Sequence, residues 1–245
     1  MGISHLISIV GAGTGDPELL TVKAHKRLKE ADVILFDALL GEEMLQLTKP
    51  DSVKIFVGKL YNDKQNQEER QNTIYNLFLY WTGLNKKIVR LKTGDPMIFG
   101  RGAEEIRFCK EHKFNYEVIP GITAGIASSS LFEIPLTERG KNSMVLFHTG
   151  HRENGEFTDF ESMKNVLKTG SPVVIYMGLN KLPDLAAALT KEGFEDSIFI
   201  QILSKISQAN QKGFETTLGG VSEFLQQNCP ETPSIIIIGK NAVRI

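Results

Sequence analysis

The stretch that decides the fold is IVRLKTGDPMIFGRG, residues 88–102. Its first four residues are β-prone, KTGDP follows as a turn, and a helical pattern resumes at Ala103. This order predicts a strand, a tight loop and a helix. Such loops follow the carboxyl ends of strands, where open α/β folds bind ligands. Gly94 lets the backbone approach a ligand and Asp95 can accept hydrogen bonds from hydroxyls, although GDP by itself is also typical of a plain structural turn.

Length and composition limit the class of protein. The chain has 245 residues, of which 41% are apolar, and 28 Lys plus Arg balance 29 Asp plus Glu. This near neutrality provides no overall field for nucleic acid or a membrane surface, so an anionic ligand needs a local cluster of cations. Cys109 and Cys229 lack metal-binding or CxxC spacing, and we expect two buried free thiols in a reducing cytoplasm and no metal. No stretch approaches the roughly 18 apolar residues that span a bilayer.

The N-terminal segment reads as strand, glycine loop and helix. Residues 6–10 are apolar, GAGTGDP follows at 11–17, and residues 18–30 have helical apolar spacing. The glycines lie at 11, 13 and 15, whereas a dinucleotide fingerprint requires 11, 13 and 16. Position 16 is Asp, whose carboxylate would repel a pyrophosphate. A nicotinamide or flavin cofactor is therefore disfavoured.

Two further predicted strands each precede a charged residue. Residues 33–36 lead to Asp37, and residues 53–57 lead to Gly58 and Lys59. Each charge by itself is typical of a solvated loop, but together they are candidates for an acid/base pair. Residues 61–71 are polar and read either as a surface connection or as a lid, before a helix at 72–81.

The rest of the chain predicts a second α/β domain. A strand at 116–119 and a small-residue helix at 122–131 lead to a turn-rich segment, after which strands and helices alternate again. We therefore expect domains at 1–134 and 141–245, joined by a linker at about 135–140. His148 and His151 suggest a hydrogen-bonded pair more than a metal site, and Met177 reads as a core residue unless its strand-end position gives it a cofactor role.

Nine motifs taken together resemble the tetrapyrrole methylases. They occur in this order: VGAGTGDPELLT, ADVILFDALL, VGK, QEE, VRLKTGDPMIFGRGAEE, VIPGITA, IPLTERG, TGH and YMGLN. The resemblance covers essentially the whole chain and is closest to the members that methylate uroporphyrinogen III. It implies two α/β domains with S-adenosyl-L-methionine bound in the cleft between them, a homodimer, and two methyl transfers that give precorrin-2. That product leads to sirohaem and cobalamin.

The resemblance also implies roles for individual residues. It makes Asp37 the proton acceptor and Lys59 the proton donor. Arg101 and Arg139 become candidates to bind the substrate's carboxylates. The implied cofactor contacts are Thr14, Thr93, Gly94, Asp95, Ile98, Thr123, Ala124 and Met177.

Four departures from the family pattern keep alternatives open. Thr14 replaces a proline, Thr93 replaces a glycine, and Glu138 replaces a histidine. The segment after Lys59 reads LYNDKQNQEE, where relatives usually have a basic, proline-containing sequence. Thr93 also occurs in related precorrin-4 methylases, but Glu138 removes positive charge that a polyanionic substrate would favour. The alternatives are a methylase of a later precorrin, a diphthine-type protein methylase, and a regulatory module that binds S-adenosylmethionine without catalysis.

Overall fold

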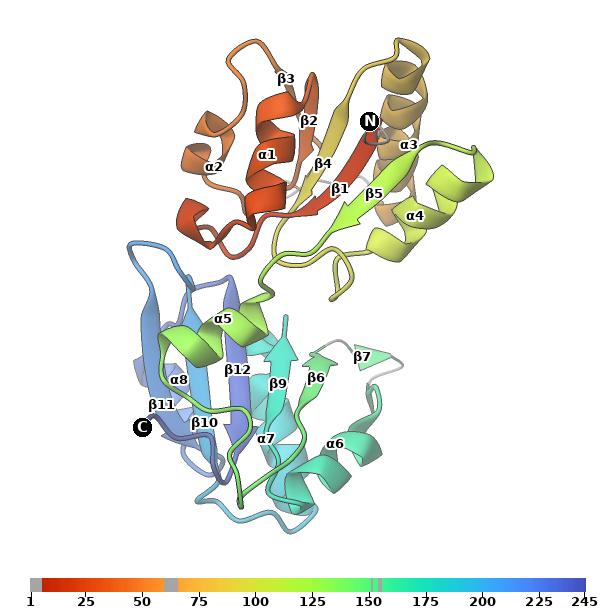
Figure 1. Ribbon diagram of the computed structural model, residues 1–245. Helices are drawn as coiled ribbons and strands as arrows, with labels where there is room; N and C mark the ends of the chain where they lie inside the picture. Colours follow the sequence, from red (N-terminus) through yellow and green to blue (C-terminus); the bar gives the residue numbers. More distant parts are fainter. Residues whose placement is uncertain (1–5, 60–65, 151, 154–155) are drawn as a thin grey trace. The chain divides into compact units, whose positions relative to one another are not determined.

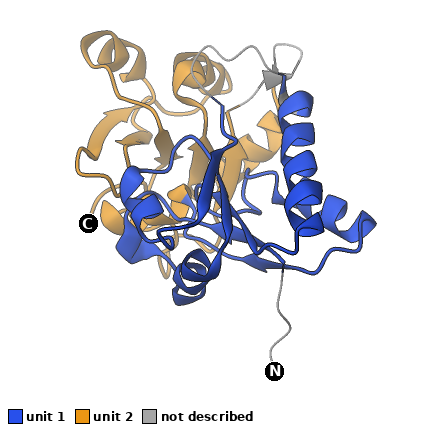
Figure 2. Cartoon of the chain, turned by 90° about the horizontal axis from the view of Figure 1, so that it is seen from above, with its two compact units in different colours: residues 1–123 blue, residues 124–245 orange. Residues whose placement is uncertain are grey.

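The computed structural model describes residues 6–59, 66–150, 152–153 and 156–245. It divides into two compact units, residues 1–123 and residues 124–245 (Figure 2). Each unit contains its own five-stranded sheet packed against helices (Figure 1). The predicted fold class, two α/β domains, is confirmed.

The first unit has an entirely parallel sheet with the strand order β3-β2-β4-β1-β5. Every residue of β1 and β4 is buried, because both strands have neighbours on each side and helices on both faces. The connection from β1 to β2 crosses one face of the sheet, and the connection from β4 to β5 crosses the other face. The strands are β1 (Ile7–Gly11), β2 (Val33–Phe36), β3 (Val53–Phe56), β4 (Ile88–Lys92) and β5 (Tyr116–Ile119).

Helices cover both faces of this sheet. Ala24, Leu28 and Met44, from α1 and α2, pack on one face, and Phe78 and Cys109, from α3 and α4, pack on the other. The helical segments are η1 (Pro17–Leu19), α1 (Val22–Glu30), α2 (Glu42–Gln46), α3 (Gln67–Gly83) and α4 (Gly102–Glu111). This layering, with helices on both faces of a parallel sheet, is a doubly wound arrangement and agrees with the predicted α/β class.

Helix starts differ from the prediction where a side chain caps the backbone. The predicted helix at 18–30 is two segments, because Thr21 Oγ1 accepts a hydrogen bond from Ala24 N at 3.1 Å and starts α1 afresh. Helix α3 starts at Gln67 and not at 72, because Asn66 and Glu69 form a reciprocal capping box. The predicted loop at 61–71 is therefore helical from 67 onward, and its residues 61–65 lie outside the described residues.

The second unit has a mixed sheet with the order β11-β10-β12-β9-β6. Only β6 and β9 are parallel; β12 runs antiparallel to β9 and β10, and β11 forms an antiparallel pair with β10. The strands are β6 (Leu146–Thr149), β9 (Val173–Tyr176), β10 (Phe199–Ser204), β11 (Lys212–Thr217) and β12 (Ser234–Gly239), beside a ribbon of β7 (Arg152–Glu153) and β8 (Glu156–Phe157). The sequence did not predict β11, since this edge strand is polar and none of its residues is fully buried.

Helices pack on both faces of the second sheet as well. Helices α6, α7 and α8 share a core with alternate strand residues such as Val173 and Ile175, whereas α5 packs against β9 and β12 on the other face. There Gly125 N donates a hydrogen bond to the Tyr176 hydroxyl at 2.8 Å. The helical segments are α5 (Ala124–Leu131), α6 (Phe160–Lys168), η2 (Leu179–Lys181), α7 (Leu182–Lys191) and α8 (Val221–Gln227).

The boundary between the units lies earlier than the predicted linker at 135–140. The division falls after residue 123, because α5 packs on the second sheet through the buried small residues Gly125, Ala127 and Ser128. The turn-rich segment is thus a loop within the second unit, between α5 and β6.

One cysteine prediction was wrong. Cys109 is buried on α4, as expected, but Cys229 is exposed. Burial raises the pKa of the Cys109 thiol to about 12.

Within the described ranges, no helix combines the length and apolar character needed to cross a bilayer.

Candidate active site

Three glycine loops converge at the carboxyl ends of β1, β4 and β5. Gly13 and Gly94 exchange backbone hydrogen bonds of 3.2 and 2.7 Å, and a Cβ on Gly121 would lie 2.3 Å from the Gly94 carbonyl oxygen. A Cβ on Gly11 would meet Gly121 N at 2.5 Å. We call Gly11, Gly94 and Gly121 the glycine platform. It offers bare backbone at the point where the strand order reverses, which is where open α/β sheets bind ligands.

Asp95 fastens the glycine platform. Its Oδ1 accepts a hydrogen bond from Met97 N at 2.8 Å, and its Oδ2 accepts one from Gly121 N at 3.0 Å. The carboxylate therefore joins the loop after β4 to the loop after β5. A residue predicted as a cofactor contact thus has a structural task as well.

Three threonines, Thr14, Thr93 and Thr123, belong to the glycine loops after β1, β4 and β5. The Thr93 hydroxyl is buried and has no hydrogen-bond partner among the described residues. Gly94 has φ +70°, and the Thr123 Cα lies 3.8 Å from where its Cβ would be. Thr14 and Thr123 are both buried. A buried hydroxyl without a partner costs about 1–3 kcal/mol, which a polar ligand at this position would recover.

The loop between β4 and α4 holds the other residues predicted from the opening stretch. Ile98 is half-buried and its N–H lies 3.4 Å from the Asp95 carbonyl oxygen. Arg101 is exposed, adopts φ +59°, and contacts Glu104 through Nε at 2.8 Å and Nη2 at 2.6 Å. The hydrogen bond to Glu104 raises the pKa of Arg101. This predicted substrate-binding cation is therefore already paired with a carboxylate.

Asp37 and Lys59 lie in neighbouring loops, as their strand-end positions predicted. Strands β2 and β3 pair in parallel, and a Cβ on Gly58 would lie 2.4 Å from Ala38 N. Asp37 Oδ1 accepts a hydrogen bond from Arg90 Nη2 at 2.5 Å. Lys59 is exposed, and within the described residues it has no ion-pair partner. The two predicted acid/base groups thus differ: one is held by a buried cation and the other is in solvent.

Arg90, Lys92 and Glu105 form a cluster of buried charged side chains, which contacts Asp37 through Arg90. The sequence analysis did not predict this cluster. Glu105 Oε1 accepts from Arg90 Nε at 3.1 Å and from Lys92 Nζ at 2.8 Å. The side chains of Arg90 and Lys92 are 3% and 4% exposed, and that of Glu105 is fully buried. Burial lowers the pKa of Lys92, assisted by the Arg90 charge. Burial also opposes the Arg90 charge, but Glu105 and Asp37 raise its pKa overall.

The sequence did contain a signal for this cluster. Arg90 and Lys92 alternate with Val89 and Leu91 in a strand that is buried on both faces. Two cations on one face of a central strand require a buried carboxylate, because an unpaired charge there is costly. Glu105 on the following helix α4 supplies it.

Met177 is the most unusual predicted residue of the second unit. It follows β9, has φ +55° and is 55% exposed, so it is not an ordinary core methionine. Next to it, a Cβ on Gly150 would lie 2.3 Å from the Gly178 Cα. Non-glycine residues in this conformation are uncommon and often mark functional positions. Ala124 is the first residue of α5 and is half-buried.

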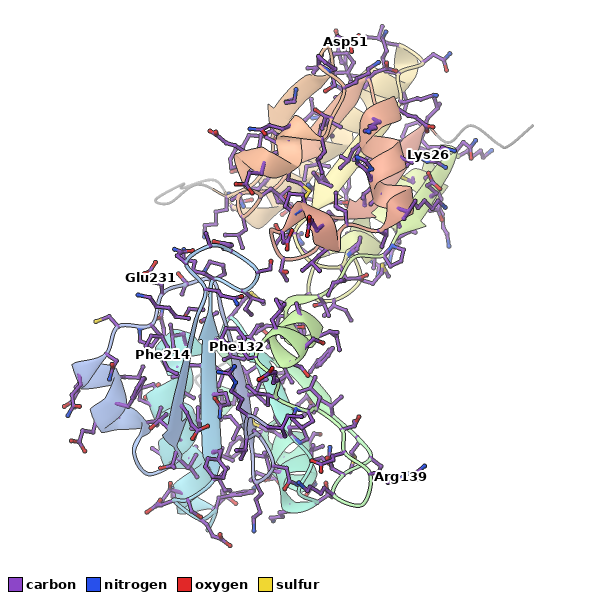
Figure 3. The ribbon with its side chains drawn as sticks, turned by 60° about the vertical axis from the view of Figure 1, so that its left-hand side comes forward. Lys26, Asp51, Phe132, Arg139, Phe214 and Glu231 are labelled. Atoms are coloured by element: carbon purple, nitrogen blue, oxygen red, sulfur yellow. The ribbon has the colours of Figure 1, made fainter. Side chains whose placement is uncertain are left out.

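Arg139 is not brought together with Met177. It precedes β6, whereas Met177 follows β9, and these two strands are parallel, so the residues lie at opposite ends of the pair. Figure 3 shows Arg139 extending from a loop at the lower right of the second unit. The neighbouring Glu138 pairs with Lys141 at 3.0 Å. A substrate role for Arg139 stays a prediction.

Of the two histidines predicted to form a pair, the structure describes only His148. His148 Nε2 lies 2.7 Å from the Thr158 carbonyl oxygen, and its Nδ1 is buried without a partner among the described residues. His151 lies outside those residues. In the part of the chain that the structure describes, no three His, Cys, Asp or Glu residues are grouped to hold a metal ion.

Comparisons with known proteins identify the family of the chain. The model of the Tetrapyrrole (Corrin/Porphyrin) Methylases matches residues 6–222. A uroporphyrinogen-III C-methyltransferase of Bacillus subtilis is 39% identical over 234 residues, which cover 95% of this chain and 89% of that protein. A siroheme synthase of Psychrobacter arcticus is 41% identical over 233 residues, covering 95% of this chain but 42% of the relative. The chain thus spans less than half the length of that siroheme synthase.

A solved structure shows the same likeness in three dimensions. The uroporphyrin-III C-methyl transferase of Thermus thermophilus, complexed with S-adenyl homocysteine, superposes with a TM-score of 0.77 at 32% identity, covering 96% of this chain and 92% of that one. The chain therefore belongs to the tetrapyrrole (corrin/porphyrin) methylases.

Proposed function

We propose that this protein is an S-adenosylmethionine-dependent C-methyltransferase that methylates uroporphyrinogen III twice and releases precorrin-2. The observation that carries the proposal is the 39% identity to the Bacillus subtilis uroporphyrinogen-III C-methyltransferase, which extends over 95% of this chain and 89% of that enzyme. The likeness thus covers almost all of a relative whose name states this activity. The product stands at the branch toward sirohaem and cobalamin.

Residues of the glycine platform fit the cofactor. The orphaned Thr93 hydroxyl and the bare backbone at Gly94 suit a ligand that carries hydroxyl and amine groups. Asp95 would fix these loops, and Thr14, Ile98 and Thr123 would add contacts. Ala124 and Met177 belong to the same proposal by family resemblance. When bound, S-adenosylmethionine supplies an electrophilic methyl group to a nucleophilic ring carbon and leaves as S-adenosylhomocysteine.

The side chains of this protein then have two tasks. They orient the macrocycle, and orientation of bound reactants can contribute about 7–11 kcal/mol in the best cases. They also move protons: for each methyl group that the macrocycle gains, the Asp37 carboxylate accepts the proton that the macrocycle loses, and family resemblance makes Lys59 the proton donor. By the same resemblance Arg101 and Arg139 are the candidates to bind substrate carboxylates, and Arg101 would exchange its contact with Glu104 for one of them.

We also propose that the enzyme works as a homodimer in the cytoplasm. Family resemblance supports the dimer, and the free thiols support a reducing compartment. Light scattering coupled to size-exclusion chromatography tests the dimer; a mass near 27.3 kDa would contradict it, since that is the mass of one chain.

The deciding experiment is an anaerobic assay with uroporphyrinogen III and methyl-labelled S-adenosylmethionine. The expected result is two labelled methyl groups per macrocycle. No incorporation with intact S-adenosylhomocysteine binding would reject uroporphyrinogen III, and the same assay with later precorrins would then separate a different methylase from a regulatory module. Thr93→Val should weaken S-adenosylhomocysteine binding about three- to tenfold, since it removes one hydrogen bond while keeping the shape.

A further inference from the structure

Hydrogen bonds hold the Arg90 guanidinium in place through all three of its nitrogens. Nη2 donates to Asp37 at 2.5 Å, Nε donates to Glu105 at 3.1 Å, and Nη1 lies 3.1 Å from the Leu91 carbonyl oxygen and 3.4 Å from that of Leu35. All three nitrogens therefore have partners on β2, β4 and α4. A planar guanidinium held in this way cannot rotate without breaking several hydrogen bonds.

Asp37 is the only exposed member of this cluster. Its side chain is 27% exposed, whereas the Arg90 side chain is 3% exposed. The contact therefore connects a solvent-accessible carboxylate to a rigid, desolvated cation. Since the dielectric constant is lower inside a protein, such a contact is stronger than an ion pair in solvent.

The cluster is electrically balanced. Arg90 and Lys92 contribute two positive charges, and Asp37 and Glu105 contribute two negative ones. A single Glu105 oxygen, Oε1, serves both cations, while Oε2 has no partner among the described residues. Removing one member of a buried ion pair typically costs about 3–5 kcal/mol because its partner is left uncompensated. A single substitution in this cluster would therefore lower the stability of the protein as well as remove a contact to Asp37, and its effect on turnover could not be assigned to either cause.

We propose that Arg90 is a positioning residue for Asp37: anchored by Glu105, it holds the Asp37 carboxylate in the orientation that accepts the substrate proton. The inference rests on the proposed function, which gives Asp37 the role of proton acceptor. Arg90 itself is buried and acts only through Asp37. Lys92 neutralises the second charge of the cluster and has no contact with Asp37 among the hydrogen bonds described above.

The charged groups around Asp37 come from several elements. Arg90 and Lys92 lie on β4, Glu105 lies on α4, and Lys59 lies in the adjacent loop. Burial raises the pKa of Tyr75 on α3, and the charges of Glu104 and Glu105 add to the effect. Of these groups, only Arg90 makes a direct ion pair with Asp37 within the described ranges.

Two double variants separate positioning from charge balance. Arg90→Gln with Glu105→Gln removes one cation and one anion and leaves Asp37 without Arg90. Lys92→Gln with Glu105→Gln removes the same charges but keeps the Arg90–Asp37 contact. Both stay neutral as a cluster, so their melting temperatures should be similar. The kcat, the KM for uroporphyrinogen III and the affinity for S-adenosylhomocysteine are measured for both.

The Arg90 double variant should lose about 100-fold in kcat, the loss expected of a misplaced catalytic group. Its KM for uroporphyrinogen III should stay close to the wild-type value, because Asp37 acts on the proton and not on binding of the macrocycle. The Lys92 double variant should lose less than tenfold in kcat. S-adenosylhomocysteine affinity should be the same in both. Equal turnover losses in the two double variants would overturn the proposal.

Two further measurements test the proposal if the wild-type protein shows no activity or if the double variants do not fold. If the wild-type protein methylates no tetrapyrrole, the proposed function fails, and crystal structures of the double variants still test positioning: the Asp37 carboxylate should keep its orientation only where Arg90 is present. If the double variants do not fold, Arg90→Lys replaces them. It keeps the positive charge without the planar fork of the guanidinium, so kcat should fall while the KM for uroporphyrinogen III stays close to wild type, and an unchanged kcat would contradict the proposal.

Discussion

Two aspartates that follow neighbouring strands differ in what their oxygens contact. Both oxygens of Asp95 accept backbone N–H groups, so this side chain holds loops together. Asp37 has one described ion pair, to Arg90, and its side chain remains 27% exposed. A loss of cofactor affinity in Asp95→Ala would therefore combine a lost ligand contact with released loops. Asp37 is the better residue for a test of chemistry.

Asp37→Asn should slow methyl transfer by about 10²–10⁴-fold, the usual contribution of a general base, while binding of S-adenosylhomocysteine stays within twofold. Asn keeps an oxygen that can accept from Arg90, so the fold should survive. The measurements are kcat under anaerobic conditions and affinity by calorimetry. Asp51→Asn is the matched control, because Asp51 is 81% exposed and precedes β3 at the opposite end of the strands (Figure 3). Equal turnover in the two variants would remove Asp37 from the mechanism.

Among elements, the glycine platform depends on how closely β1, β4 and β5 bring their loops together. Gly121→Ala would place a methyl group 2.3 Å from the Gly94 carbonyl oxygen and 2.7 Å from Gly11. Backbone atoms cannot move aside as a flexible side chain can. We expect a loss of about 3 kcal/mol in the free energy of unfolding, at the upper end for overpacking.

The matched control for that prediction is Gly83→Ala. Gly83 ends helix α3 and has no atom within 4 Å of its added Cβ. Alanine there should stabilise the protein by about 0.5–1 kcal/mol through reduced chain entropy. Urea denaturation midpoints measure both variants, and a Gly121→Ala protein as stable as wild type would show that the loops are less tightly packed than described.

Glu117 links α1 to the edge strand β5. Its carboxylate accepts from Ser8 Oγ at 3.0 Å, pairs with Lys23 at 2.7 Å and contacts Arg27. Burial by itself would raise the pKa of Glu117, but the hydrogen bonds from Arg27, Lys23 and Ser8 lower it to about 2. The cluster lies on the α1 side of β5, and its role is to fix helix to strand.

This shift predicts a pH dependence of stability. A carboxyl whose pKa is lower in the folded state stabilises the protein above its unfolded pKa, and the contribution is lost as pH falls from about 4.5 toward 2. The contribution is about 3 kcal/mol. Glu117→Gln should lower the free energy of unfolding at pH 7 by that order and flatten its decline below pH 5. The exposed Glu111→Gln should keep the wild-type pH dependence, and identical curves for both variants would refute the assignment.

At the scale of the whole molecule, the rates at which the two cysteine thiols react show whether the protein is folded. Cys229 is exposed, whereas Cys109 is buried on α4 with a pKa raised to about 12 by burial. A disulfide reagent at pH 8 should modify one thiol rapidly and the second only as urea unfolds the first unit, because the thiolate is the reactive form. Cys229→Ser should abolish the rapid phase. Rapid modification of both thiols in the native protein would contradict the burial of α4.

Sequence pattern by itself determined the α/β class, most strands of both sheets and the glycine loops after β1, β4 and β5. These features are local: buried strands are apolar runs, and glycine and proline mark turns wherever the chain folds. It also placed Asp37 and Lys59 at strand ends. Capped helix starts at Thr21 and Asn66 were readable but missed, since helical apolar spacing continues across Thr21 and Asn66 lies in a polar segment.

Only the tertiary structure decided the features that depend on contacts between distant residues. The edge strand β11 exists because β10 pairs with it, and α5 belongs to the second unit because its small residues pack on β9 and β12. The Arg90–Glu105 contact joins a strand to a helix fifteen positions away, and Arg90–Asp37 joins residues 53 positions apart. Periodicity reports which face of an element is apolar, but a buried ion pair is stable only when the fold brings both charges together and removes them from water.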